Sequence, residues 1–249
     1  MKQVLFIDAG NRRIKYAVRK KNSLVFHVAS SIPCFLNQMR ALKKPFSCCV
    51  YSSVLSVRET AKLIKGIQSE CDRIYPLKDL ATGLLKTSYD MNKLGDDRLA
   101  SLLACYFNKW GSCVIIDAGT AVTIDFFKGP DVFYGGFICS GFSTELEALS
   151  DKTGRLPLLK PRMVRTRNIP RNTEQALLQG VINTRALGIR ALIGKTLAEK
   201  KRDDENWKYI LTGADAKFLR AYFPEAFLVR NLVIEGMDMV YLNILKAGG

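Results

Sequence analysis

The tetrapeptide Ile-Asp-Ala-Gly occurs twice in this chain, at residues 7–10 and again at 116–119. Each copy follows a short apolar run and precedes a small polar residue, Asn11 or Thr120, and then a second β-rich run. Glycine in such a turn lets a phosphate approach backbone N–H groups, and the aspartate can hold a hard cation. The repeat therefore predicts two related halves that face each other across a nucleotide. Two coincidental strand-to-turn junctions would look the same, because Asp and Gly both favour turns.

The composition is that of a globular protein with ample material for a core. Of the 249 residues, 48% are hydrophobic and 24% are charged, which is ordinary for a soluble fold. That length suits one large domain or two of about 120 residues, and the repeat favours two. No apolar stretch reaches the roughly 18 residues that a membrane-spanning helix needs, so we expect no membrane association.

The cysteines and the N-terminal residues indicate in which cellular compartment we expect the protein. Seven cysteines in no regular spacing indicate reduced thiols. The N-terminus enters an expected strand directly, without the pattern of a signal peptide. We therefore expect a cytoplasmic protein. The single histidine, His27, stands in an apolar run, which argues against a zinc site or a histidine-based triad.

The net charge of +15 raises nucleic acid as a partner. The positive residues are scattered, however, and their short runs are not interleaved with aromatic residues as in a stacking platform for bases. An anionic small substrate such as ATP would gain from the same field. We therefore expect a small-molecule substrate rather than nucleic acid.

Short β-rich runs separated by polar turns predict a three-stranded meander at the start of each half. In the first half the strands are Val4–Asp8, Ile14–Val18 and Leu24–Ala29. There follow a strand at Cys48–Tyr51, a helix from about Ser56 to Ser69, a short strand at Ile74-Tyr75, loops over a cleft at 76–94 and a helix over Gly95–Lys109. The last helix has apolar residues at helical spacing and acids in its first turn.

The second half repeats the pattern. Its first strands are Cys113–Asp117, Val122–Phe127 and Val132–Cys139. There follow helices from Gly141 to about Leu149 and from Asn172 or Thr173 to about Ala198, a strand at Trp207–Leu211, and helices over Ala214–Tyr222 and Leu232–Leu245. No low-complexity linker divides the chain. We expect the halves to join around residues 105–115, which gives 1–110 and 111–249. The alternation predicts an α/β architecture with mixed sheets.

Two segments of the first half have residues suited to phosphoryl chemistry. The run from Asp8 to Lys15 puts an aspartate, a glycine turn and a lysine in one hairpin, as a metal-bound polyphosphate requires. The run Gly95-Asp96-Asp97-Arg98 opens a helix with a carboxylate beside a guanidinium. Such a pair could take a hydroxyl proton and hold an anion. Acids that merely match the helix dipole would explain this start as well.

Two further segments lie in the second half. Residues 117–125 form a second Asp-Ala-Gly hairpin with hydroxyls at regular spacing. Residues 135–141, Gly-Gly-Phe-Ile-Cys-Ser-Gly, place glycines at a strand-to-helix junction. Backbone could approach a ligand there, although close packing of helix on sheet would also explain the glycines.

Together and in this order, the four segments resemble the type III pantothenate kinases, a bacterial branch of the actin-like, sugar kinase and Hsp70 ATPase superfamily. The family pattern is Asp-x-Gly-Asn-Thr-x-x-Lys, Gly-x-Asp-Arg, Asp-x-Gly-Thr-Ala-x-Thr-x-Asp and Gly-Gly-x-Ile-x-Pro-Gly. The resemblance continues through Thr153–Pro157, Asn172–Leu177, Leu211–Asp215 and Leu232–Gly236. It implies an α/β fold of two duplicated ribonuclease H-like (actin-like ATPase) halves, each a mixed β-sheet with flanking helices, with ATP in the cleft between.

The resemblance also implies a reaction, the ATP-dependent phosphorylation of pantothenate to 4′-phosphopantothenate, which is the first step of coenzyme A biosynthesis. Asp97 would be the general base, and Arg98 would bind the pantothenate carboxylate. The implied ATP-binding residues are Asp8, Ala9, Gly10, Asn11, Arg12, Arg13, Ile14, Lys15 and Thr120. The implied pantothenate-binding residues are Tyr89, Gly95, Asp96, Asp97, Arg98 and Thr173.

The same resemblance implies two cations and a dimer. Asp8 would lie near the Mg²⁺ that accompanies ATP, and Asp117 would bind a monovalent cation, K⁺ or NH₄⁺. The family forms homodimers in which part of the substrate pocket comes from the partner.

The chain departs from the family pattern at three positions. Arg12 replaces a threonine next to the phosphates, Ser140 replaces a proline, and Ala214 replaces a glycine. The exchange at Arg12 bears most on function, although a guanidinium can itself bind phosphate.

Two alternatives remain open. The first is a catalytically weak regulatory relative, since some members of the family were first described as accessory factors for transcription. The second is another enzyme of the superfamily, such as a sugar kinase or an exopolyphosphatase. The joint presence of Asp8, Lys15, Asp97, Arg98, Asp117 and Thr120 argues against the first. Gly95–Arg98 and Asn172-Thr173 argue against the second.

Overall fold

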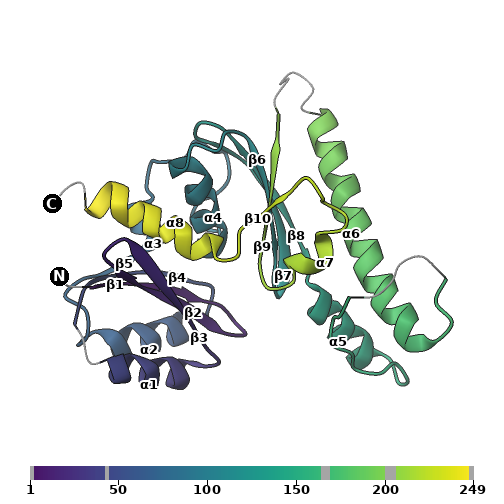
Figure 1. The fold of residues 1–249 in the computed structure, drawn as a ribbon, viewed down its shortest axis with the longest axis horizontal. Coiled ribbons are helices and arrows are strands. Elements are labelled where there is room, and N and C mark those ends of the chain that lie inside the picture. Colours follow the sequence, from purple (N-terminus) through teal and green to yellow (C-terminus); the bar gives the residue numbers. More distant parts are fainter. Residues whose placement is uncertain (1–2, 43–44, 164–168, 200–205, 247–249) are drawn as a thin grey trace. The chain divides into compact units, whose positions relative to one another are not determined.

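The computed structural model describes residues 3–42, 45–163, 169–199 and 206–246, which fall into two compact units (Figure 1). One unit comprises Met1–Trp110, Gly129–Phe133 and Asn231–Gly249, and the other comprises Gly111–Lys128 and Tyr134–Arg230. The first two segments of these units meet between Trp110 and Gly111, and residues 129–133 and the C-terminal residues from Asn231 on belong with the first unit.

The first unit contains a five-stranded mixed sheet in the order β3-β2-β1-β4-β5. The strands are β1 (Gln3–Ala9), β2 (Ile14–Lys20), β3 (Ser23–Ala29), β4 (Phe46–Ser53) and β5 (Ile74–Pro76). The first three form the predicted antiparallel meander, and β4 and β5 add in parallel. The register places Asp8 opposite Lys15 at the end of the first hairpin.

Helices cover both faces of this sheet (Figure 1). They are α1 (Ile32–Leu42), α2 (Val57–Ile67), α3 (Leu77–Leu80), α4 (Asp96–Phe107), α8 (Leu232–Val240) and a π-helix, η1 (Tyr241–Leu245). Phe35 and Met39 of α1 and Leu63 of α2 are buried in the core with the strands. Two of these helices differ from expectation: α1 had not been predicted, and α3 lies in the segment expected to be loop.

The second unit has the same strand arrangement, in the order β10-β9-β6-β7-β8. Its strands are β6 (Cys113–Ala118), β7 (Ala121–Lys128), β8 (Val132–Ser140, which joins this unit from Tyr134 on), β9 (Lys208–Thr212) and β10 (Phe227–Leu228). Its helices are α5 (Phe142–Lys152), α6 (Thr173–Glu199) and α7 (Ala216–Leu219). The helix expected over Ala214–Tyr222 is therefore shorter, and β10 had not been predicted. The matching strand orders confirm the duplication that the repeated tetrapeptide predicts.

None of the helices within the described ranges is both long and apolar enough to cross a membrane.

The C-terminal helix α8 is held in the first unit by two contacts that join distant parts of the sequence. Gly236 lies so close to α4 that a Cβ there would come within 1.9 Å of the Ala100 carbonyl oxygen. Arg19 of β2 donates two hydrogen bonds to the carboxylate of Asp238, and both side chains are largely buried. A bare glycine and a buried ion pair thus fix α8 against both α4 and the sheet.

We predict that Gly236→Ala destabilises the protein, because the added methyl group would have to displace the backbone of Ala100 rather than a flexible side chain. Overpacking of this kind typically costs about 1–3 kcal/mol of unfolding free energy. Urea unfolding of the variant measures the loss. Gly188→Ala is the matched control, since a Cβ there meets nothing within 4 Å and alanine is favoured in a helix. Equal stability of the two variants would contradict the prediction.

Candidate active site

The first Asp-Ala-Gly turn presents a short backbone loop beside an acid and a base. The Gly10 N–H donates to the Arg13 carbonyl at 3.2 Å, which closes the turn. Across the hairpin, Lys15 Nζ lies 3.9 Å from Asp8 Oδ2. Asn11, Arg12 and Arg13 are exposed at the tip, whereas Ala9 and Ile14 are buried in the core. This arrangement leaves the tip of the turn and the lysine open to an anionic ligand.

Burial disfavours the charged form of the Asp8 carboxylate, and a bound cation would stabilise that form. Burial raises its pKa from 3.8 to about 6, Lys15 opposes that shift, and the negative charge of Asp97 adds to it. The influence of Asp97 means that the first turn and the start of α4 share one electrostatic environment. A divalent ion fits beside Asp8, because its charge would offset the burial of this carboxylate.

At the start of α4, a glycine makes room for the acid that follows it. Gly95 caps the helix in an extended conformation, and a Cβ there would lie 2.6 Å from Asp97 Oδ1. The Arg98 N–H donates to the same oxygen at 2.8 Å. Burial raises the pKa of Asp97 above its ordinary value of 3.8, and the Arg98 N–H and guanidinium oppose that shift. Asp97 is therefore a held carboxylate of raised basicity, as a proton acceptor requires.

Arg98 is oriented by two aromatic rings. The residue is 5% exposed, and its Nη1 donates to the Tyr89 hydroxyl at 3.2 Å. Its guanidinium carbon lies 5.4 Å from the Tyr89 ring centre and 5.9 Å from that of Phe133. Phe133 is held in turn by Lys86, whose carbonyl accepts from the Phe133 N–H at 2.9 Å. Sequence reasoning missed Phe133, because no local motif marks a contact between residues so far apart in the chain.

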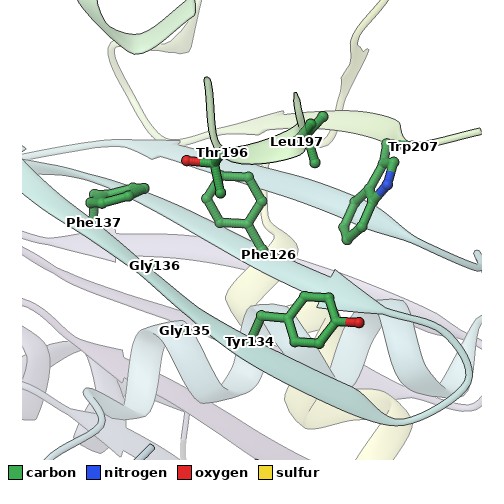
Figure 2. A pocket seen from close by; sticks show the side chains of 8 residues that line it. All are labelled: Phe126, Tyr134, Gly135, Gly136, Phe137, Thr196, Leu197 and Trp207. Atoms are coloured by element: carbon green, nitrogen blue, oxygen red, sulfur yellow. The ribbon is translucent and has the colours of Figure 1, made fainter. Parts of the chain in front are cut away.

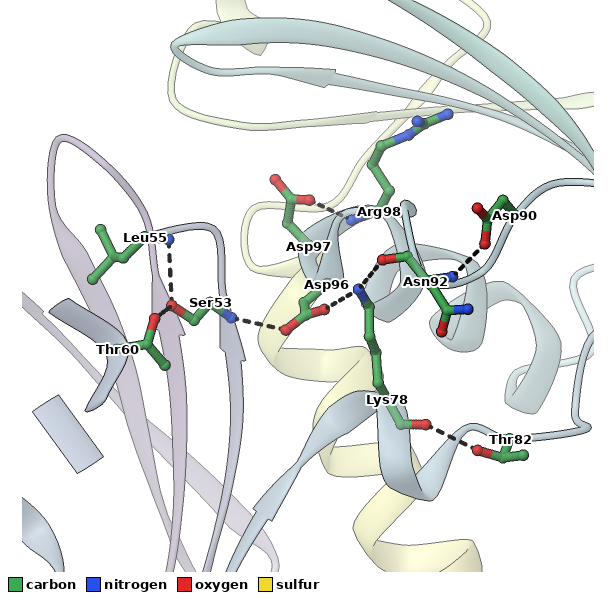
Figure 3. A network of polar contacts seen from close by, with 10 residues as sticks. All are labelled: Ser53, Leu55, Thr60, Lys78, Thr82, Asp90, Asn92, Asp96, Asp97 and Arg98. Carbon is green, nitrogen blue, oxygen red and sulfur yellow. Dashed lines mark hydrogen bonds and ion pairs between the residues drawn. The ribbon is translucent and has the colours of Figure 1, made fainter. Parts of the chain in front are cut away.

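Asp96 turns away from its neighbours Asp97 and Arg98 (Figure 3). Its Oδ2 accepts from the Ser53 N–H at 3.2 Å, and its Oδ1 lies 3.3 Å from Lys78 Nζ. The first unit thus brings Tyr89, Gly95, Asp96, Asp97 and Arg98 together at one end of α4. Thr173, by contrast, is in the second unit, where it begins α6 and is exposed.

The second Asp-Ala-Gly turn lies in the second unit and is packed tightly by glycines. Gly213 has a φ of +92°, and a Cβ there would lie 2.4 Å from Asp117 Oδ1 and 2.3 Å from the Ala118 carbonyl oxygen. The Thr120 carbonyl accepts from the Thr144 hydroxyl at 2.7 Å, while the Thr120 side chain is exposed. Gly213 is thus required by close packing against this turn, since a side chain there would collide with the Asp117 carboxylate and the Ala118 carbonyl.

Close packing explains Gly136 within β8 and Gly141, which follows that strand. A Cβ on Gly136 would come 2.1 Å from the Ile124 carbonyl oxygen, and one on Gly141 would come 2.2 Å from that of Gly119. Gly136 also lines a pocket of about 100 Å³ whose walls are aromatic and uncharged (Figure 2). Its lining residues are Phe126, Tyr134, Gly135, Gly136, Phe137, Thr196, Leu197 and Trp207. Such walls do not suit a phosphate.

No cage of three or more His, Cys, Asp or Glu side chains occurs among the residues that the structure describes. A divalent ion beside Asp8 would supply charge neutralisation for a bound polyphosphate, which is the usual role of Mg²⁺ in phosphoryl-transfer enzymes.

Two mixed sheets of the same order, each with an Asp-Ala-Gly turn after its first strand, are the duplicated ribonuclease H-like halves of the actin-like ATPase fold. The crystal structure of the ethanolamine utilization protein EutJ from Carboxydothermus hydrogenoformans shares this fold. It matches with a TM-score of 0.54 at 11% identity, over 96% of this chain and 90% of that one. The class is thus set by topology rather than by close sequence similarity.

A family model described as type III pantothenate kinase matches residues 4–195. The type III pantothenate kinase of Porphyromonas gingivalis strain W83 is 31% identical over 95% of this chain and 96% of its own length. A Campylobacter jejuni crystal structure, assigned to the Baf family of transcriptional activators, matches with a TM-score of 0.62 at 26% identity, over 97% and 99%. The chain belongs to the type III pantothenate kinase family, whose members phosphorylate pantothenate on the route to coenzyme A.

Proposed function

We propose that this protein transfers the terminal phosphoryl group of ATP to the hydroxyl of pantothenate, with Asp97 as the general base. The observation that carries the proposal is the start of α4, where a carboxylate of raised pKa precedes a guanidinium held by Tyr89 and Phe133. Arg98 would bind the carboxylate of pantothenate, and Asp97 would take the proton of the attacking hydroxyl. General-base assistance is typically worth about 10²–10⁴-fold.

The first turn supplies the phosphate side of the reaction. The tip from Gly10 to Arg13 and the ammonium of Lys15 would hold the polyphosphate, with Arg12 adding a guanidinium where the family pattern has a threonine. Mg²⁺ held by Asp8 would neutralise charge on the transferred group. Positioning and charge neutralisation are the main requirements of phosphoryl transfer.

Further parts of the proposal concern the second unit and the assembly. Asp117 would bind K⁺ or NH₄⁺, and the exposed hydroxyl of Thr120 would contact ATP. The enzyme would be a homodimer, with Thr173 contributing to pantothenate binding. All seven cysteines are free thiols, which supports a reducing cytoplasmic location.

The experiment is an assay of ADP release with pantothenate as substrate, in the presence and absence of K⁺ or NH₄⁺. We expect pantothenate-dependent ADP formation that requires a divalent ion and rises with the monovalent ion, with 4′-phosphopantothenate identified by mass spectrometry. A regulatory relative would bind ATP without forming ADP, and the absence of ADP formation with either monovalent ion would favour that alternative.

A further inference from the structure

Lys78 lies on α3, within the segment that the sequence predicted to be loop, and it joins two parts of the candidate pantothenate site (Figure 3). Its Nζ donates to the carbonyl oxygen of Asn92 at 3.2 Å and lies 3.3 Å from Asp96 Oδ1. One ammonium group therefore connects the loop before α4 to the first turn of α4.

The Asp96 carboxylate is engaged on both of its oxygens by groups of the protein. While Oδ1 faces Lys78, Oδ2 accepts from the Ser53 N–H at the end of β4. The Ser53 hydroxyl is itself hydrogen-bonded at 2.7 Å to Thr60 of α2. The Asp96 side chain is 13% exposed. Its two oxygens thus anchor the start of α4 to the end of β4 and to α3.

The loop that Lys78 holds carries Tyr89. The loop folds on itself through Asp90, which accepts from the Asn92 N–H with Oδ1 and from the Lys93 N–H with its carbonyl, each at 3.0 Å. The Tyr89 hydroxyl of the same loop accepts from Arg98 of α4. The loop is therefore tied to the start of α4 at two points, through Tyr89 and through the Asn92 carbonyl that Lys78 binds.

We infer that Lys78 and Asp96 are positioning residues of the pantothenate site. They hold the loop 87–94 against the start of α4, so that Tyr89, Asp97 and Arg98 keep one geometry. Neither residue is given by the family motif, because Asp96 occupies the open position of Gly-x-Asp-Arg and Lys78 lies outside every motif. The inference rests on the proposed function, and it revises the expectation that Asp96 binds substrate directly.

The kinetic test compares Lys78→Met with Lys78→Arg and with the control Lys93→Met. Lys93 pairs with Asp90 at 3.8 Å on the exposed side of the same loop. We expect Lys78→Met to raise the KM for pantothenate about tenfold, the size of one lost charge-assisted hydrogen bond. The KM for ATP should change by less than about twofold, and Lys78→Arg should restore most of the pantothenate affinity, since it keeps the charge.

A double variant tests whether Lys78 acts through Asp96. If it does, Lys78→Met combined with Asp96→Asn should be no worse than the more damaging single variant, because residues of one network are not additive. A proportional rise in both KM values, or additive losses in the double variant, would overturn the positioning role.

Amide hydrogen exchange on the free protein tests the same link without any activity. Lys78→Met should speed exchange across residues 87–98 relative to wild type, and Lys93→Met should not. Unchanged exchange in Lys78→Met overturns the inference whatever the kinetics show. If wild type forms no ADP with pantothenate, the proposed function fails, and the exchange measurement still decides whether Lys78 holds the loop.

Discussion

Replacement of Asp97 by asparagine is expected to lower turnover by about 10²–10⁴-fold while leaving the affinity for ATP near that of wild type. Asparagine has the size of aspartate, so it should still fit against Gly95 and accept the Arg98 N–H. It cannot take a proton from the attacking hydroxyl. The loss should therefore appear in the chemical step rather than in nucleotide binding.

The measurement is kcat for pantothenate-dependent ADP release, together with the dissociation constant for ATP from calorimetry. Asp151→Asn is the matched control, because Asp151 is an exposed acid in α5, outside the candidate site. It should keep wild-type turnover. Near-wild-type turnover in Asp97→Asn would remove the general-base role and leave Asp97 as a structural residue of the helix start.

The strands of this fold could be predicted from sequence because their signal is local. In each meander, short apolar runs separated by turns predict the strands. The second copy of the tetrapeptide shows where the second meander begins. The missed elements lack such a signal. Helix α1 buries only Phe35 and Met39 and has a proline in its first turn, while β10 is two exposed residues paired to β9. Their formation depends on neighbours that are distant in sequence.

The assignment of the C-terminal helix to the first unit could not be predicted for the same reason. Its sequence shows a helix, but the contacts that place it involve Ala100 of α4 and Arg19 of β2. Nothing near residue 236 indicates that its glycine is required by a carbonyl group more than a hundred positions earlier.

Some residues of the candidate site could be predicted from motifs, whereas the residues that support them could not. Motifs identified Asp8, Lys15, Asp97 and Arg98, and strand register or helix position then brings each pair together. The residues that hold these groups could not be found by motif. Phe133, Lys78 and Ser53 act through side-chain or backbone contacts across loops, and such contacts depend on the folded arrangement.

Asp8→Asn is expected to have opposite effects on activity and on stability. In the proposed function the carboxylate holds the divalent ion, so the variant should require much more Mg²⁺ at saturating ATP and turn over slowly. In the metal-free protein, however, the same carboxylate is a cost. Its side chain is 13% exposed, and its pKa is raised from 3.8 to about 6 by burial. At neutral pH the folded state therefore holds a buried charge that only Lys15 partly offsets.

The sign of the pH dependence follows from the raised pKa. Between about pH 4 and pH 6 the folded state binds a proton at Asp8 that the unfolded state has lost, so wild type loses stability as pH rises through this range. Below it, Asp8 is protonated in both states and the cost vanishes. The full shift corresponds to about 3 kcal/mol of unfolding free energy, which is the upper limit of the gain from asparagine.

Urea unfolding in the presence of a chelator, at about pH 4 and about pH 7.5, measures this difference. Asp8→Asn should be more stable than wild type at the higher pH and nearly equal to it at the lower pH, whereas Asp151→Asn should match wild type at both. Addition of Mg²⁺ and ATP should reverse the order, because ligand binding stabilises only the variant that binds well. If Asp8→Asn were less stable than wild type at both pH values, the carboxylate would be a structural group, and the proposal that this turn holds its cation at a cost to the free protein would fail.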